Sequence, residues 1–270
     1  MIPLPARHAA VLRDLQTIWT PERFIVIGAA AIACHLDFRW RITVDLDLSV
    51  AATPEDFAKD LQGLGWRREK GAQQRWVAPD GTYVDVLPAP PAFVREGEFT
   101  WPDGSARLNL VGFRLAFADA VPLEQTPGIR ARVASLPSLV VLKMASYLDR
   151  PRERDSDLAD ITHILSSFLP ADDERRWSDD VVNLGLEYDD VSPFVLGKRI
   201  GALVDDAERA LVRKFLSAID DPDDPLATAG RMARAARMAP SDPDRLRARF
   251  KAFRRGLETK SCGGHGSSLG

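Results

Sequence analysis

RITVDLDLSV (residues 41–50) is the stretch that decides how the first half of the chain folds. Side chains alternate across a β-strand, so residues two apart share a face. One face is wholly apolar and comprises Ile42, Val44, Leu46, Leu48 and Val50, whereas the other comprises Arg41, Thr43, Asp45, Asp47 and Ser49. We therefore expect a strand over residues 41–50 that packs its apolar face on a core and presents two carboxylates in one direction.

Strands and helices alternate around this stretch. Thr53 followed by Pro54 is typical of a helix start, and Asp80-Gly81 between two apolar runs is typical of a hairpin. The elements expected up to residue 136 are helices at 6–18, 29–36 and 53–65, strands at 23–28, 41–50, 108–116 and 129–136, and a hairpin at 75–88.

The pattern becomes helical after residue 134. Helices are expected at 135–150, 156–169, 178–189, 192–219, 225–238 and 243–257. The predicted fold is α+β, with a mixed sheet flanked by helices in a first domain (1–134) and a helical second domain (135–258). The Gly- and Ser-rich residues 259–270 are expected to form a disordered tail.

Composition narrows the functional classes. The chain of 270 residues is 45% hydrophobic and 28% charged, which is typical of a globular protein. No apolar run reaches the roughly 20 residues of a membrane helix, and the first residues lack the pattern of a secretion signal. The two cysteines provide neither a disulfide framework nor a zinc site. We therefore predict a cytoplasmic protein without membrane partners.

The net charge of −3 is unevenly distributed. Residues 230–256 contain nine Lys or Arg and two Asp, a local charge of +7 that leaves −10 elsewhere. Such a segment either binds nucleic acid or docks on the acidic part of the same chain. The pattern alone leaves both interpretations open.

Paired carboxylates suggest a metal site. Asp45 and Asp47 repel each other unless solvent or a cation compensates, and Mg²⁺ or Mn²⁺ is held by such oxygen ligands together with substrate phosphates. Asp85 lies on a later strand, where it could complete a three-carboxylate site for phosphoryl transfer. A solvated strand face is the alternative interpretation.

Two further features are compatible with a phosphate ligand. Gly28 lies between a strand and a helix, where backbone N–H groups and the helix dipole favour an anion. Lys143 is the one Lys or Arg in the apolar stretch 136–148 of the helix expected at 135–150, so it either extends to solvent or meets an anion.

These residues resemble the DNA polymerase β-type nucleotidyltransferase superfamily, and within it the AbiEii/AbiGii toxin-like branch. The similarity covers about residues 20–165 and rests chiefly on the R-x-T-x-D-L-D segment at 41–47. Further matches are Gly28-Ala29-Ala30-Ala31, Asp85, Lys143 and the segment from Arg154 to Ile161.

The resemblance implies a role for each matching residue. Asp45, Asp47 and Asp85 would be catalytic and would bind Mg²⁺ or Mn²⁺. Nucleotide contacts would come from Gly28, Ala29, Arg41, Thr43 and Lys143, with Arg154, Asp157 and Asp160 in support at the rear of the cleft. Ala29 and Ser156 depart from the family pattern, in which serine or glycine and lysine respectively are common.

The implied function is transfer of a nucleoside monophosphate from an NTP to an acceptor hydroxyl, with release of pyrophosphate. In the toxin-like branch the acceptor would be an RNA such as tRNA, and a protein antitoxin would be a partner. Two alternatives stay open: a catalytically silent module of the same fold that binds NTP, RNA or protein, and a transferase acting on a small molecule such as an antibiotic.

Overall fold

The computed structural model describes residues 4–36, 43–104, 106–124, 126–236 and 243–259. Contacts between residues divide the chain into unit 1 (Met1–Asp160) and unit 2 (Ile161–Gly270). The boundary therefore differs from the one predicted near residue 134, and the helix that contains Lys143 belongs to unit 1. Arg41 and nearly all of the predicted tail lie outside the described residues.

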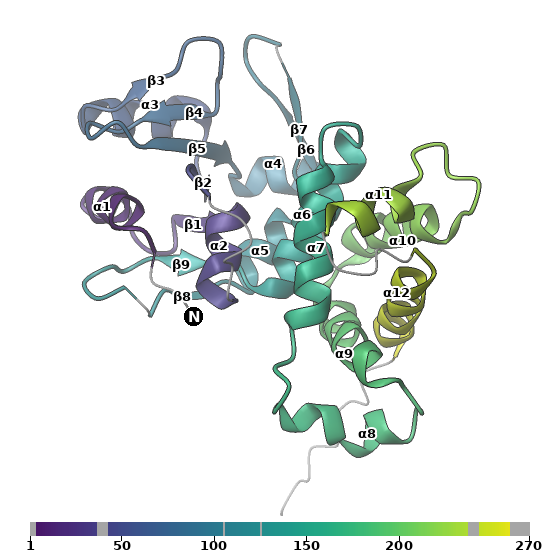
Figure 1. Ribbon diagram of the computed structural model, residues 1–270. Coiled ribbons are helices and arrows are strands. Elements are labelled where there is room, and N and C mark those ends of the chain that lie inside the picture. Colours follow the sequence, from purple (N-terminus) through teal and green to yellow (C-terminus); the bar gives the residue numbers. More distant parts are fainter. Residues whose placement is uncertain (1–3, 37–42, 105, 125, 237–242, 260–270) are drawn as a thin grey trace, which may run out of the picture. The chain divides into compact units, whose positions relative to one another are not determined.

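Unit 1 is built on a seven-stranded mixed sheet with the strand order β3-β4-β5-β2-β1-β9-β8 (Figure 1). The strands are β1 (Phe24–Ile27), β2 (Leu46–Val50), β3 (Arg67–Arg68), β4 (Arg75–Val77), β5 (Tyr83–Pro88), β8 (Val121–Pro122) and β9 (Arg132–Val133). The central strand β2 is antiparallel to β1 and parallel to β5. A separate two-stranded sheet pairs β6 (Glu98–Thr100) with β7 (Arg107–Asn109).

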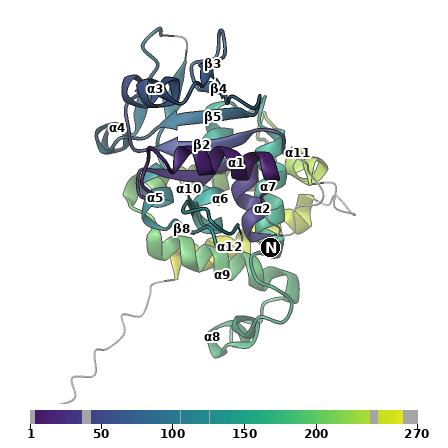
Figure 2. The same ribbon diagram turned by 90° about the vertical axis from the view of Figure 1, so that its left-hand side faces the viewer.

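Helices cover both faces of the large sheet. They are α1 (Ala6–Leu15), α2 (Gly28–His35), α3 (Pro54–Gly63), α4 (Pro91–Glu96), α5 (Phe113–Ala118) and α6 (Leu136–Asp149). Helices α1 and α3 lie on one face, and α2, α5 and α6 on the other (Figures 1 and 2). The predicted apolar face of β2 is confirmed for Leu46, Leu48 and Val50, which are fully buried on the face that α1 and α3 cover. Because the second face is also covered, Ser49 is fully buried too.

The strand predicted at 41–50 is wrong in its first described residues. Thr43, Val44 and Asp45 precede β2, and Val44 is 54% exposed instead of buried. Helix α1 provides the reason, because His8 Nε2 lies 3.1 Å from the carbonyl oxygen of Val44. In addition, Arg7 Nη2 donates to the carbonyl of Thr43 at 3.4 Å. These carbonyls are thus occupied by side chains and not by a neighbouring strand.

Several other sequence predictions are confirmed in unit 1. The Thr53 hydroxyl accepts a hydrogen bond from the N–H of Asp56 at 3.3 Å and begins α3. The Asp80-Gly81 turn joins β4 to β5, with Gly81 at φ +86°. The strand predicted at 108–116 is wrong in its second half, because Gly112 at φ +97° ends the extended segment and α5 follows.

Unit 2 is helical, and helix α7 (Asp155–Ser167) runs across the boundary between the units. The other helices are the 3₁₀ turn η1 (Glu174–Trp177), α8 (Asp179–Val182), α9 (Tyr188–Leu203), α10 (Asp206–Asp220), α11 (Thr228–Ala235) and α12 (Pro243–Glu258). The single helix predicted at 192–219 is two helices, because Asp205 and Glu208 form a capping box that starts α10. The helix predicted at 178–189 is reduced to α8 and the start of α9.

Helices α9 and α12 approach each other closely at glycines. A Cβ atom at Gly197 would lie 2.0 Å from the carbonyl oxygen of Phe253, and one at Gly256 would lie 2.0 Å from that of Phe194. Only glycine permits this backbone contact. Among the helices of the described ranges, none has the length and apolar character needed to cross a membrane.

Candidate active site

Asp47 and Asp85 lie side by side on neighbouring parallel strands. They are register partners in the pairing of β2 with β5, so both side chains leave the same face of the sheet. Each is partly buried, and both line one wall of a cavity. The predicted convergence of these two carboxylates is therefore present in the fold.

Gly28 begins α2 directly beside Asp47. Its φ of +68° is in the left-handed region, and a Cβ atom there would lie 2.0 Å from Asp47 Oδ2. Ile27 is the register partner of Asp47, which brings the end of β1 and the start of α2 next to the carboxylate. The absence of a side chain at position 28 thus lets Asp47 lie close to the helix start, where the helix dipole favours negative charge.

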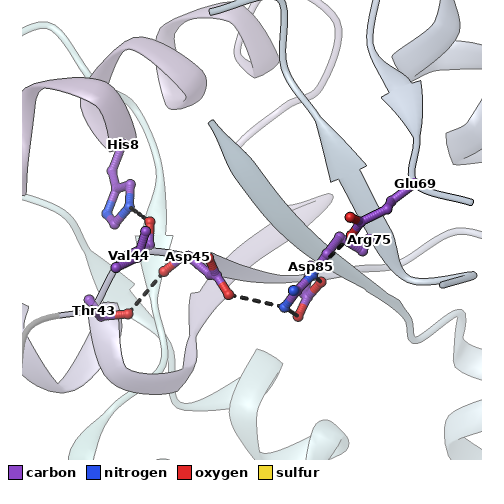
Figure 3. Close-up of polar contacts among 7 residues, drawn as sticks. All are labelled: His8, Thr43, Val44, Asp45, Glu69, Arg75 and Asp85. Atoms are coloured by element: carbon purple, nitrogen blue, oxygen red, sulfur yellow. Dashed lines mark hydrogen bonds and ion pairs between the residues drawn. The ribbon is translucent and has the colours of Figure 1, made fainter. Parts of the chain in front are cut away.

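Arg75 joins Asp45 to Asp85, as Figure 3 shows. Its Nε and Nη2 atoms donate to the two oxygens of Asp85, each at 2.9 Å, and Nη2 also donates to Asp45 Oδ2 at 3.0 Å. Glu69 Oε2 lies 3.8 Å from Nε. One guanidinium group therefore contacts two of the three predicted metal ligands.

The Arg75 guanidinium is firmly held in its charged form. Its hydrogen bonds to Asp85 raise the pKa of Arg75 above its usual value, against the opposing effect of burial, and the charges of Asp45 and Glu69 act in the same direction as Asp85. The side chain of Asp85 is 19% exposed, compared with 36% for Asp45. Asp85 is thus the more enclosed partner of this cation.

The cavity has a volume of about 280 Å³ and is formed within unit 1. Its wall combines acidic, basic and apolar side chains from strands β1, β2 and β5, the β6–β7 hairpin, α6 and the start of α7. The charged residues are Asp47, Asp85, Arg107, Lys143, Asp149, Arg150, Arg154 and Asp157, and Gly28 and Trp101 also line it. This volume is close to about 300 Å³, the lower end of the range of volumes for ligand pockets.

Other predicted nucleotide contacts lie elsewhere in the described part of the chain. Ala29 is buried at 3% exposure, and neither it nor Thr43 belongs to the cavity wall. The Thr43 hydroxyl donates instead to the carbonyl oxygen of Asp45 at 3.0 Å. Asp45 too is outside the cavity wall, and Arg75 Nη2 links it to Asp85, which does line the cavity.

Of the two expectations for Lys143, solvent or an anion, the structure shows an anionic partner. That partner is a pair of carboxylates of the same chain. Lys143 Nζ lies 2.7 Å from Asp157 Oδ1 and 2.7 Å from Asp160 Oδ2. Burial opposes the charged form, but the two carboxylates outweigh it and raise the pKa of Lys143. Burial likewise opposes ionisation of Asp157, but the charge and hydrogen bond of Lys143 outweigh this effect and lower the pKa of Asp157. Lys143 is therefore the main cationic partner of both aspartates, and the charge of Arg154 also lowers the pKa of Asp157.

The basic segment near the C-terminus docks within unit 2. Five arginines of α12 contact groups of that unit: Arg245 with Asp189, Arg247 with the Ile219 carbonyl, Arg249 with Ser166 and Asp189, Arg254 with Asp220, and Arg255 with the Leu184 carbonyl. Of the two interpretations that the charge pattern left open, the structure supports docking on the same chain for these residues.

The donor set can be compared with what a divalent cation requires. Within the described residues, no three His, Cys, Asp or Glu side chains are already grouped as a metal site. However, Arg75 Nη2 is within hydrogen-bond distance of one oxygen from Asp45 and one from Asp85, so a cation already lies between these carboxylates. Carboxylate oxygens are the ligands that Mg²⁺ prefers. Asp45 and Asp85 thus have the donor chemistry that a divalent cation requires, and Asp47 is the register partner of Asp85.

Sequence reasoning missed Arg75, Arg107 and Arg150. A signal for Arg75 existed, because a hairpin centred on Asp80-Gly81 pairs Val77 with Tyr83 and then Arg75 with Asp85. The other two depend on the β6–β7 hairpin and the α6–α7 connection, which carry no comparable signal.

No protein-family model matches the chain, and no curated protein sequence matches it.

Proposed function

We propose that the chain is a metal-dependent nucleotidyltransferase of the polymerase β type. The observation that carries this proposal is the register pairing of Asp47 with Asp85 beside Gly28, at one wall of a cavity that also contains Arg150 and Arg154. Carboxylates for a cation and basic groups for phosphates therefore share one site. Such a combination suits the transfer of a phosphoryl group, in which positioning and electrostatics provide most of the catalysis.

In this proposal each residue has a defined task. Asp45, Asp47 and Asp85 would hold Mg²⁺ or Mn²⁺, which when bound supplies charge neutralisation for the phosphates and the reacting oxygens. Arg150 and Arg154 would contact the phosphates of the NTP. Asp85 would accept the proton of the acceptor hydroxyl as its oxygen attacks the α-phosphorus. The bond from that phosphorus to the bridging oxygen then breaks, and pyrophosphate leaves with the bonding electrons.

The role of Lys143 changes relative to the sequence-based expectation. Because two aspartates already neutralise it, Lys143 would position Asp157 in the cavity wall and would not serve as the main phosphate ligand. Gly28 would act by allowing the approach of Asp47.

The acceptor is proposed to be an RNA hydroxyl, with tRNA as the first candidate, and the chain to be a toxin with a protein antitoxin. Only the family resemblance supports this part, since the arginines of α12 that suggested an RNA surface contact their own unit. Residues for testing RNA contact are therefore the cavity arginines and not α12.

The test is incubation of the purified full chain with each of the four labelled NTPs, Mg²⁺ and total RNA. We expect label transfer with one or more NTPs, and a loss of about 10²-fold or more in Asp47→Asn and Asp85→Asn. Asp60→Asn is the matched control, because Asp60 is a partly exposed carboxylate bound to Arg23 at 2.8 Å in the same unit. Transfer that is absent for all NTPs, or equal in the three variants, contradicts the proposal.

Two additions to this test separate the alternatives. When an aminoglycoside is added, label on the aminoglycoside but not on RNA identifies a small-molecule acceptor. Calorimetric NTP binding without any transfer identifies a silent binding module, for which the Arg75 contacts to Asp45 and Asp85 would be a permanent replacement of the metal.

A further inference from the structure

Arg75 occupies the space between two carboxylates that the proposed reaction requires for a metal. Its Nη2 is 2.9 Å from Asp85 Oδ2 and 3.0 Å from Asp45 Oδ2 (Figure 3). A magnesium ion would approach each oxygen to about 2.0–2.1 Å. Metal and guanidinium would then share the same oxygens, and two positive charges at that separation repel each other. Binding of one therefore opposes binding of the other.

Two contacts offer Arg75 a position outside the carboxylate pair. Glu69 Oε2 lies 3.8 Å from Nε, and the guanidinium carbon lies 5.9 Å from the centre of the Tyr83 ring. The side chain is also 33% exposed, so it can rotate towards solvent without unpacking the core. Lys143 differs in this respect, because it is buried between its two aspartates.

Building on the proposed function, we propose that Arg75 is an internal counter-ion of the active site. It neutralises Asp45 and Asp85 while no metal is bound, and an arriving divalent cation displaces it towards Glu69 and Tyr83. This exchange sets the metal affinity of the site. Before the metal arrives, the guanidinium group of Arg75 holds the two carboxylates together.

Metal affinity tests this role without reference to catalysis. Mn²⁺ binding to the full chain, without nucleotide, is measured by electron paramagnetic resonance for the wild type, Arg75→Gln and Arg75→Lys. We expect Arg75→Gln to bind Mn²⁺ about tenfold more tightly or more, because a competing positive charge is removed, with Arg75→Lys between the two. Equal or weaker binding by folded Arg75→Gln overturns the proposal.

Arg23→Gln is the matched control. Arg23 donates to Asp60 at 2.8 Å, is 36% exposed, and lies 5.7 Å from the centre of the Trp19 ring, a setting that resembles that of Arg75. Its loss is expected to leave Mn²⁺ affinity unchanged. A tightening equal to that of Arg75→Gln would show a general charge effect and would also overturn the proposal.

A measurement on the wild type covers the case in which Arg75→Gln does not fold. The Nε–H resonance of Arg75, assigned by its loss in Arg75→Lys, is followed by nuclear magnetic resonance during a Mg²⁺ titration. A saturable shift supports displacement, and an unchanged resonance at saturating Mg²⁺ contradicts it. If competition is observed without nucleotidyl transfer, the proposed reaction fails and the counter-ion role stands. If transfer is observed but Arg75→Gln leaves the Mn²⁺ affinity unaltered, the proposed reaction stands and the counter-ion role fails.

Discussion

The carboxylate of Asp47 lies against the Cα atom of Gly28, in the space that a side chain at position 28 would fill. A Cβ atom at Gly28 would lie 2.0 Å from Asp47 Oδ2, and φ at Gly28 is +68°. Two independent constraints, backbone conformation and steric contact, thus act at one residue. The strand, the helix start and the carboxylate therefore form one local unit that a single methyl group would disturb.

Gly28→Ala is expected to lower stability and to impair metal binding together. A left-handed backbone costs a non-glycine residue about 1–2 kcal/mol, and the contact with Asp47 adds to that cost. Gly81→Ala is the control, because Gly81 has φ +86° and nothing within 4 Å of its Cβ position. Urea unfolding and Mn²⁺ binding check both variants. Equal effects of the two substitutions would show that the contact with Asp47 is unimportant.

Removal of the Lys143 charge is expected to destabilise unit 1 strongly. Lys143→Met would leave Asp157 and Asp160 buried without their cation, at a cost of about 3–5 kcal/mol. The control is Arg107→Met, since Arg107 and Glu98 form a pair 2.9 Å apart whose side chains are 65% and 55% exposed. Exposed pairs contribute about 0–1 kcal/mol. Chemical denaturation measures both, and a similar loss in the two variants would contradict the buried-pair interpretation.

The buried His8 and the partly buried His35 predict a dependence of stability on pH. Burial lowers the pKa of His8 and of His35 below 6.5, although the carbonyls of Val44 and Ala134 act in the opposite direction. As the pH falls below 6.5, the unfolded chain therefore binds protons that the folded chain does not, and the free energy of unfolding decreases.

His8→Gln is designed to isolate the His8 contribution. A glutamine amide can donate to the Val44 carbonyl, as His8 Nε2 can, but it does not titrate. The free energy of unfolding of this variant is expected to fall less steeply than that of the wild type between about pH 6.5 and pH 5. Identical slopes in urea titrations across this range would show that His8 does not contribute.

The glycine contacts between α9 and α12 predict an unusual effect of alanine. A helical Gly→Ala change normally stabilises by about 1 kcal/mol. Gly197→Ala is expected to destabilise instead, because its Cβ would lie 2.0 Å from the Phe253 carbonyl oxygen. Gly230→Ala in α11 is the control, since its nearest neighbour is the Arg234 side chain at 3.5 Å. Thermal unfolding compares them, and stabilisation by both substitutions would contradict the packing described for Gly197.

Local sequence signals predicted much of unit 1. The alternation in β2 identified Leu46, Leu48 and Val50 as core, and the Asp80-Gly81 turn identified the β4–β5 hairpin. Both signals operate between residues close in sequence. The same alternation failed at Val44, because α1 provides hydrogen bonds to this segment from more than 30 residues away.

The candidate site was predictable only in part for the same reason. Asp45, Asp47 and Asp85 follow from strand alternation and family resemblance, and Asp47 does pair with Asp85. The ion pairs were not predictable from composition, since many acidic and basic residues could have partnered Lys143 or Asp85. Only the tertiary fold selects Asp157 and Asp160 for the lysine and Arg75 for Asp85.

The central claim is that Asp45, Asp47 and Asp85 form a metal-dependent active site for nucleotides. A crystal of the full chain soaked with Mn²⁺ and a non-hydrolysable NTP analogue tests it most directly, through anomalous scattering from the metal. We expect an anomalous peak about 2.1–2.2 Å from carboxylate oxygens of at least two of these aspartates, with Arg75 moved away from Asp45. At saturating Mn²⁺, an absent peak with Arg75 still bound to both Asp45 and Asp85 would contradict the claim.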